Sequence, residues 1–163
     1  MSDLQDTKYV GGVRKLAQRI ATIRENLAVP PMVTEIGELL LKRTLKRFDD
    51  EVDPDGRRWT PLAHETLMRR RRNPSARGTK ILNATGKMRA SIKRLLGDPH
   101  GAFAVATGAG FRIGVADPLQ ADKARVHQNG TPRVPQRRFL GIGKTDITAV
   151  DGLLRRRAAK LGL

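Results

Sequence analysis

The tripeptide Gly143-Lys144-Thr145 has the residue types that close a phosphate-binding P-loop, in which backbone N–H groups and a lysine hold the phosphates of a nucleotide. That motif also needs a glycine five residues before its second glycine, and this position is occupied by Arg138. A loop that leads into a helix is therefore the favoured interpretation. Gly108, Gly110 and Gly114 imitate a dinucleotide fingerprint, but a strand-like run follows them where the fingerprint needs a helix N-terminus.

The three histidines do not form a metal site in the sequence. His64-Glu65 begins like a zinc-protease helix, but the second histidine of that motif would fall at Met68. His100 and His127 are isolated, and the chain has no cysteine that could complete a zinc set. No serine lies in a nucleophile-elbow pattern, and no close pair of carboxylates lies in an apolar setting. We therefore expect no enzyme activity, no cofactor, no metal and no small-molecule substrate.

Length and composition indicate one soluble domain. A chain of 163 residues can bury a hydrophobic core without disulfides, and the absence of cysteine fits a reducing compartment or a virion without cross-links. No apolar run approaches the roughly 20 residues that span a bilayer. The N-terminus carries Asp3 and Asp6 where a signal peptide has basic residues. We expect a protein without a membrane partner that resides in the cytoplasm before any assembly.

The net charge of +16 predicts an acidic partner or a polyanion, because self-repulsion of this size is unfavourable unless it is screened. Between Arg57 and Arg94 there are twelve basic residues and one acid, Glu65. The candidate contacts with DNA or with an acidic protein are Arg69, Arg70, Arg71, Arg72, Arg133, Arg137 and Arg138. A solvated helix end for the first four, and a plain surface loop for the last three, remain as alternatives of similar weight.

Apolar periodicity and caps predict the helices. The expected helices span about residues 12–26, 31–50 after Pro31, 61–72 capped by Thr60, 86–95 capped by Thr85, 119–128, and a last amphipathic helix capped by Thr145 or Asp146. Alternating residues predict a hairpin of strands at 102–107 and 111–115, with an edge strand at 139–142.

These elements predict an α+β fold in which N-terminal helices pack on a small, mainly antiparallel sheet, with a C-terminal helix. We expect a single domain over 1–163, with a helical arm at 1–30, a core at 31–163 and a mobile Arg-rich loop at about 69–80. Asp53-Pro54-Asp55-Gly56 has proline and glycine in the positions of a tight turn. Trp59, the only tryptophan, is expected in the core or, with lower weight, as an interface anchor.

Three ordered blocks of sequence carry a family resemblance. They are Pro54, Gly56, Trp59, Pro61 and Leu62; then Leu82, Thr85, Gly86, Met88, Ser91 and Ile92; then His127, Gln128, Gly130, Pro135, Arg137, Phe139, Leu140 and Gly141. In this order they resemble the virion morphogenesis and tail completion family of tailed bacteriophages, the small head-tail joining proteins of Mu-like phages. The resemblance covers roughly residues 36–150, and the long Arg-rich insertion between the first two blocks departs from the family pattern.

The resemblance implies a structural virion protein of the phage tail or neck. It implies a self-associated ring of about six copies, coaxial with the tail, that contacts neck and tail tube proteins and lies in the path of the packaged DNA. The alternative is a free, non-specific DNA- or RNA-binding protein, which the charge supports. No recognition-helix pattern, zinc finger or stacking aromatic motif accompanies that charge, so we favour the virion protein.

Overall fold

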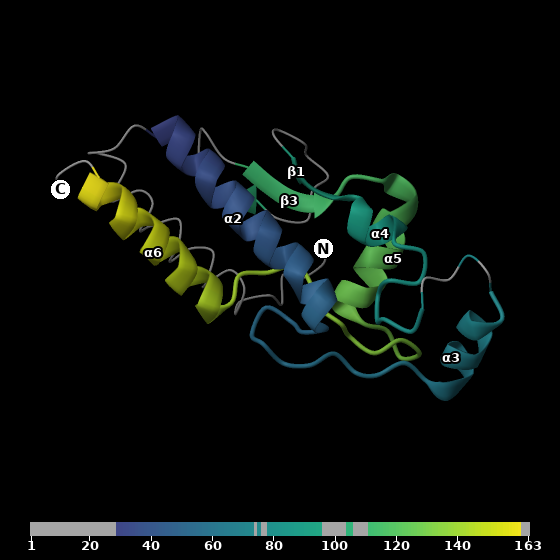
Figure 1. The fold of residues 1–163 in the computed structure, drawn as a ribbon. Coiled ribbons are helices and arrows are strands. Elements are labelled where there is room, and N and C mark those ends of the chain that lie inside the picture. Colours follow the sequence, from purple (N-terminus) through teal and green to yellow (C-terminus); the bar gives the residue numbers. More distant parts are fainter. Residues whose placement is uncertain (1–28, 74, 76–77, 96–103, 106–110, 161–163) are drawn as a thin grey trace, which may run out of the picture.

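The computed structural model describes residues 29–73, 75, 78–95, 104–105 and 111–160. In chain order its elements are α2 (Val29–Asp50), α3 (His64–Arg71), α4 (Lys87–Ala90), β1 (Ile92–Leu95), β2 (Ala104–Val105), β3 (Phe111–Val115), α5 (Pro118–Asn129) and α6 (Lys144–Lys160) (Figure 1). The predicted mixture of helices and strands is confirmed, and helices predominate among the described residues. The helix predicted at 12–26 lies outside the described residues.

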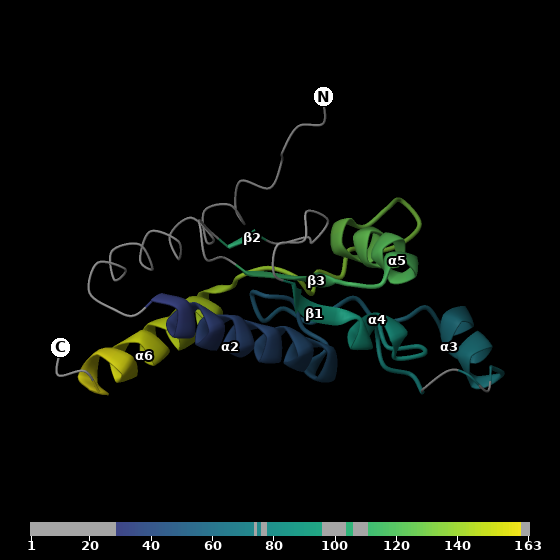
Figure 2. The same cartoon turned by 90° about the horizontal axis from the view of Figure 1, so that it is seen from above.

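Helices α2 and α6 lie side by side and run in opposite directions (Figures 1 and 2). The described strands are short and pair antiparallel in the order β1-β3-β2, with Ile92 opposite Val115 and Ala104 opposite Arg112. Helix α2 packs on one side of β3, and α5 lies on the other side (Figure 2). The strands contribute less than predicted, because most buried core residues come from the helices and from the loops between them.

Helix α2 forms where the sequence predicts it and ends at the predicted Asp50. Its buried stripe repeats every fourth residue through Ile36, Leu40, Thr44 and Phe48, which places these side chains on one face of the helix. The structure also confirms α5, whose N-cap Asp117 accepts a hydrogen bond from the Leu119 N–H at 2.9 Å. Gly130, at φ 74°, follows its last turn, as the Asn129-Gly130 pair predicts.

The single helix predicted over 86–95 is wrong. A short helix, α4, occupies Lys87–Ala90, and β1 follows it as the partner of β3. The N-cap is Gly86 at φ 78°, and Thr85 makes only a long contact of 3.5 Å with the Lys87 N–H. Ile92 and Leu95 are apolar and three residues apart, a spacing that fits one face of a helix as well as the two ends of a four-residue strand. Pairing with β3 makes this segment a strand.

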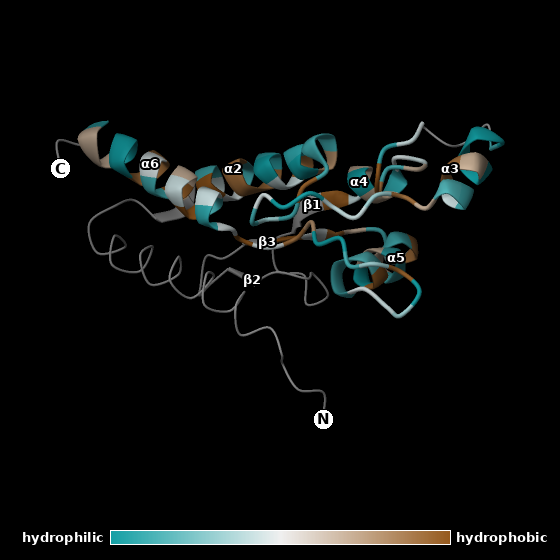
Figure 3. Cartoon of the chain, turned by 90° about the horizontal axis from the view of Figure 1, so that it is seen from below, coloured by the Kyte–Doolittle hydropathy of each residue, from teal (hydrophilic) through white to brown (hydrophobic). Residues whose placement is uncertain are grey.

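Two other predicted boundaries are also wrong. Helix α3 begins at His64 after Ala63 rather than at Pro61, so Thr60 is not its cap. The segment 139–142 is not a strand, because its backbone N–H groups bind a side chain and no neighbouring strand. Figure 3 shows α3 with hydrophilic ends and a short apolar middle, and the helix buries no residue. It stands at the end of the molecule opposite the end of α6 (Figure 1).

The loop before α6 packs tightly against the turn at Asp53-Pro54-Asp55-Gly56. A Cβ atom on Gly143 would lie 1.7 Å from the carbonyl oxygen of Pro54, so two backbone segments touch here. This close approach of two backbone segments accounts for the glycine of the Gly143-Lys144-Thr145 tripeptide.

Replacing Gly143 by alanine is expected to lower the free energy of unfolding by about 1–3 kcal/mol, because the two backbones must separate. Gly152→Ala is the matched control, since Gly152 lies inside α6 and a Cβ there meets only the far end of the Arg156 side chain at 3.4 Å. That control should be neutral or should stabilise the protein by up to about 1 kcal/mol. Urea unfolding of both variants measures the difference, and equal midpoints would contradict the close approach.

Candidate basic cleft

The first and third sequence blocks meet around Trp59. Its indole N–H donates to the Arg138 carbonyl at 2.8 Å, and its ring meets Phe48 edge-on at a centroid distance of 5.5 Å. The Arg138 guanidinium in turn pairs with Asp53 at 3.0 Å and with Asp55 at 2.9 Å. Trp59 is 4% exposed, which confirms the core interpretation. The first and third blocks are therefore held together by the contacts of Trp59 and Arg138.

Gln128 holds the third block in place. Its side-chain oxygen accepts the N–H groups of Phe139 and Leu140, each at 3.1 Å, and its amide donates to the Leu140 carbonyl at 2.8 Å. Phe139 is thereby fixed beside Phe48, at a centroid distance of 5.2 Å. The Gln128 side chain of α5 thus replaces the backbone partner that a strand would have supplied to Phe139 and Leu140, so this segment, which bends at 140–141, needs no sheet.

A buried ion cluster joins α2 to α6. Asp146, which is 1% exposed, accepts hydrogen bonds from Arg47, from Arg43 at 2.6 Å and from the Gly143 N–H at 2.8 Å. Arg47 also donates to the carbonyls of Phe139 and Gly141, both at 2.9 Å. Burial lowers the pKa of Arg47, and the negative charge of Asp146 opposes that shift. The sequence predicted Asp146 only as a helix cap, and the arginines of α2 gave no signal of this pairing.

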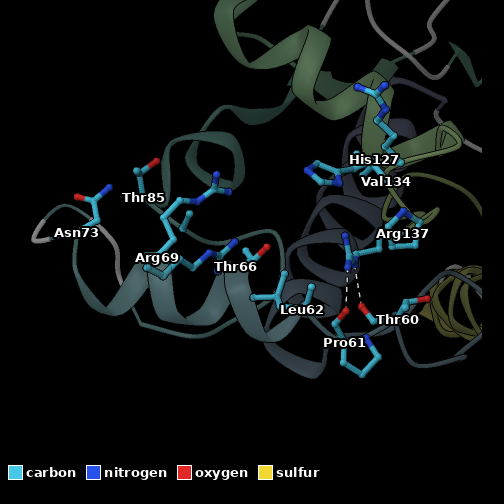
Figure 4. A pocket seen from close by; sticks show the side chains of 15 residues that line it. Thr60, Pro61, Leu62, Thr66, Arg69, Asn73, Thr85, His127, Val134 and Arg137 are labelled. Atoms are coloured by element: carbon cyan, nitrogen blue, oxygen red, sulfur yellow. Dashed lines mark hydrogen bonds between the residues drawn. The ribbon is translucent and has the colours of Figure 1, made fainter.

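A cleft of about 820 Å³ opens between α3 and the end of α5. It is called the basic cleft below, and its lining is Thr60, Pro61, Leu62, Ala63, Thr66, Arg69, Arg70, Asn73, Ala84, Thr85, His127, Arg133, Val134, Pro135 and Arg137. Figure 4 shows Thr66 and Arg69 of α3 on one wall and His127 and Arg137 on the other. The lining contains no aspartate or glutamate.

The basic cleft gathers four of the seven predicted interaction residues. Arg69 and Arg133 are exposed at its edges, and Arg70 is half-buried and donates to the Lys80 carbonyl at 2.6 Å. Arg71 and Arg72 are exposed on α3 and at its end but do not line the cleft. Arg138 lies outside it, in the ion pairs with the turn. Of the seven predicted contact residues, the structure therefore brings only these four together at one cleft.

Arg137 was predicted as a contact with a partner or as part of a plain surface loop, but the structure buries it. It is 5% exposed, and its guanidinium donates to the Thr60 carbonyl at 2.8 Å and to the Pro61 carbonyl at 3.0 Å (Figure 4). These bonds occupy the carbonyls of Thr60 and Pro61, residues that lie outside the helix, and α3 starts later than predicted. Arg137 therefore braces the floor of the basic cleft and contributes its positive charge without leaving the protein.

The cationic groups in the basic cleft repel one another. Burial is the main reason that the pKa of Arg137 is lowered, and the neighbouring charge of Arg70 adds to the effect. The pKa of Arg70 is lowered by burial and then by Arg69. Burial, Arg137 and Arg70, in that order, lower the pKa of His127, whose Nδ1 atom is buried without a hydrogen-bond partner among the described residues. The cleft is therefore set up to receive negative charge.

The lowered pKa of His127 makes folding stability depend on pH. In the unfolded chain the imidazole of His127 has its ordinary pKa of about 6.5. In the folded chain that pKa is lower, so the imidazole takes up its proton only at lower pH. Stability is therefore expected to fall as pH drops below about 6.5, since the unfolded state then holds more protons. His127→Gln should show a smaller fall between neutral and mildly acidic pH in urea unfolding. His64→Gln on the exposed start of α3 is the control and should follow the wild type.

The described part of the chain holds no group of three or more His, Asp or Glu residues that could bind a metal ion. In the same ranges, no helix is long and apolar enough to cross a membrane. The basic cleft, which gathers four of the predicted contact arginines, is the candidate functional surface.

Comparison with known proteins supports the resemblance carried by the three blocks. No curated protein and no solved structure gives a significant match. The sequence model of the phage virion morphogenesis family matches residues 10–158, which extends the resemblance seen over 36–150 at both ends and includes the Arg-rich insertion. The chain therefore belongs to the phage virion morphogenesis family, and this membership indicates a role in the structure or assembly of phage particles.

Proposed function

We propose that this protein is a structural virion component that completes the phage tail or joins it to the head. The observation that carries the proposal is family membership over residues 10–158. The contacts of Trp59 and the buried Arg47–Asp146 pair support it, because they hold distant parts of the chain in fixed positions, as a structural subunit requires. The proposal assigns the protein no catalytic role and no cofactor.

The proposed assembly is a ring of about six copies, coaxial with the tail. Each copy brings a net charge of +16, so a closed ring needs acidic neighbours or DNA phosphates close to its basic faces. The exposed bases Arg69, Arg71, Arg72 and Arg133 are the candidates for these contacts. Neck and tail tube proteins are the proposed protein partners, and the genome passes through the channel.

Electron microscopy of particles made without this protein tests the proposal. Tails of irregular length are expected if the protein ends the tail tube, and separated heads and normal tails are expected if it joins the two. Normal, infectious particles would overturn both versions. Because the docking is electrostatic in this proposal, attachment of the purified protein to incomplete particles should also weaken as salt is added.

A free nucleic-acid-binding protein is the second candidate, favoured by the exposed arginines on α3. Phosphate neutralisation by arginine would give affinity without sequence preference. A gel shift with duplex DNA at physiological salt, beside a mass measurement of the oligomer, separates the two functions. A defined ring with weak DNA binding supports the virion role, and a monomer with tight binding supports the alternative.

A further inference from the structure

The basic cleft has more positive charge than its own chain neutralises. None of its arginines forms an ion pair among the described residues, and the bonds of Arg70 and Arg137 end on neutral carbonyls. Elsewhere in the same ranges, arginines are matched with acids, as in Arg89–Asp49 at 3.0 Å and in Arg138–Asp53 at 3.0 Å. The contrast indicates that the positive charge in the cleft is available to pair with a negatively charged group of another molecule.

The shape and the apolar part of the lining define the class of that group. A volume of about 820 Å³ lies in the range of pockets that enclose small or short ligands, whereas a DNA duplex presents its phosphates on a broad convex surface. Single-stranded nucleic acid is held by stacking on aromatic rings, and the lining has no Phe, Tyr or Trp. Leu62, Val134 and Pro135 instead offer aliphatic contacts beside the charges. Carboxylates that alternate with aliphatic side chains fit this combination.

We propose that the basic cleft receives an acidic peptide segment of a neighbouring virion subunit, whose carboxylates pair with Arg69 on α3 and with Arg133 on the facing loop. His127 and Arg137 form the inner wall against which the segment lies (Figure 4). That the partner is a virion subunit rests on the proposed function. Occupation of the cleft would tie α3, which buries no residue of its own, to the rest of the protein.

Binding of a short fluorescein-labelled peptide that alternates glutamate and leucine tests the proposal, with the lysine–leucine peptide as the charge control. The probe is expected to bind the wild-type protein and to lose at least about tenfold in affinity for the double variant Arg69→Glu, Arg133→Glu. The matched control, Arg155→Glu with Arg156→Glu, makes the same charge change at exposed residues of α6, outside the cleft. It should change the affinity by less than about threefold.

Equal losses in the two double variants would overturn the proposal, because they would reflect net charge and not the cleft. Absence of glutamate-peptide binding to the wild type would also overturn it. Displacement of the peptide by a short DNA duplex at physiological salt, with duplex binding lost in the same variant, would assign the surface to nucleic acid. If the glutamate variant fails to fold, Arg69→Gln with Arg133→Gln replaces it, with the same expected loss of affinity.

Complementation of phage that lack the protein separates this proposal from the proposed function. Wild-type protein that enters particles, beside an Arg69→Glu, Arg133→Glu variant that stays out of them, supports both. If the variant assembles as well as the wild type, the cleft proposal fails and the virion role stands. If the wild-type protein restores particles without becoming part of them, the proposed structural role fails, whereas the peptide measurement still judges the cleft.

Discussion

Replacing Asp146 by asparagine is expected to cost about 3–5 kcal/mol of unfolding free energy. The side chain is 1% exposed and receives hydrogen bonds from Arg47, from Arg43 and from the backbone of Gly143. An amide of nearly the same shape removes the negative charge but leaves Arg47 buried. The pKa of Arg47 is already lowered by burial, so its guanidinium would lose the negative charge that most strongly opposes this effect.

The control for Asp146 is the same substitution at an exposed ion pair. Asp122 pairs with Arg125 at 3.0 Å, and the two side chains are 84% and 72% exposed. Asp122→Asn should therefore change stability by less than about 0.5 kcal/mol. Denaturant unfolding at neutral pH compares both variants with the wild type. A loss below about 1 kcal/mol for Asp146→Asn would show that the buried pair does not hold α6 to α2.

Trp59→Ala is expected to destabilise the protein by about 3–5 kcal/mol. The substitution empties the space between Phe48 and the third sequence block, and it removes the 2.8 Å hydrogen bond to the Arg138 carbonyl. The ion pairs of Arg138 with the turn should weaken with it, since the same residue anchors both. Thermal and denaturant unfolding measure the loss.

Trp59→Phe separates packing from hydrogen bonding at the same position. It keeps an aromatic ring next to Phe48 but leaves the Arg138 carbonyl without its donor, so a smaller loss, of roughly 1 kcal/mol from the hydrogen bond plus a packing term, is expected. Leu119→Ala tests the opposite extreme, because Leu119 is 81% exposed and should lose almost nothing. If Trp59→Ala lost as little unfolding free energy as Leu119→Ala, the contacts of the indole would not stabilise the fold.

Periodicity in the sequence predicts the long elements well and the short ones poorly. Helix α2 and helix α5 were predictable because one buries a stripe at every fourth residue and the other has a cap and a terminating glycine. Residues 86–95 were not, since a four-residue strand leaves too little pattern to distinguish it from a helix. The segment 139–142 resembles a strand in sequence because it is mostly apolar, but it bends at 140–141, and the N–H groups of Phe139 and Leu140 donate to the Gln128 side chain.

The candidate site was predictable in composition but not in geometry. The sequence identifies Arg69, Arg70, Arg133 and Arg137 as unusual, and the structure brings these four to one cleft. The sequence cannot distinguish a buried arginine from an exposed one, because guanidinium groups form internal hydrogen bonds as well as contacts with other molecules. Arg137 and Arg138 are of the first kind, and their acceptors lie more than seventy residues away in the chain. No local pattern contains that information.

The solitary indole at residue 59 also gives the protein a natural optical reporter. Its environment combines a neighbouring phenyl ring, a carbonyl acceptor and almost complete exclusion of water, so its emission reports on one known location. Release of the block that contains Arg138 would shift that emission to longer wavelengths. Fluorescence of unlabelled protein can therefore show whether incorporation into a particle leaves this junction closed or opens it.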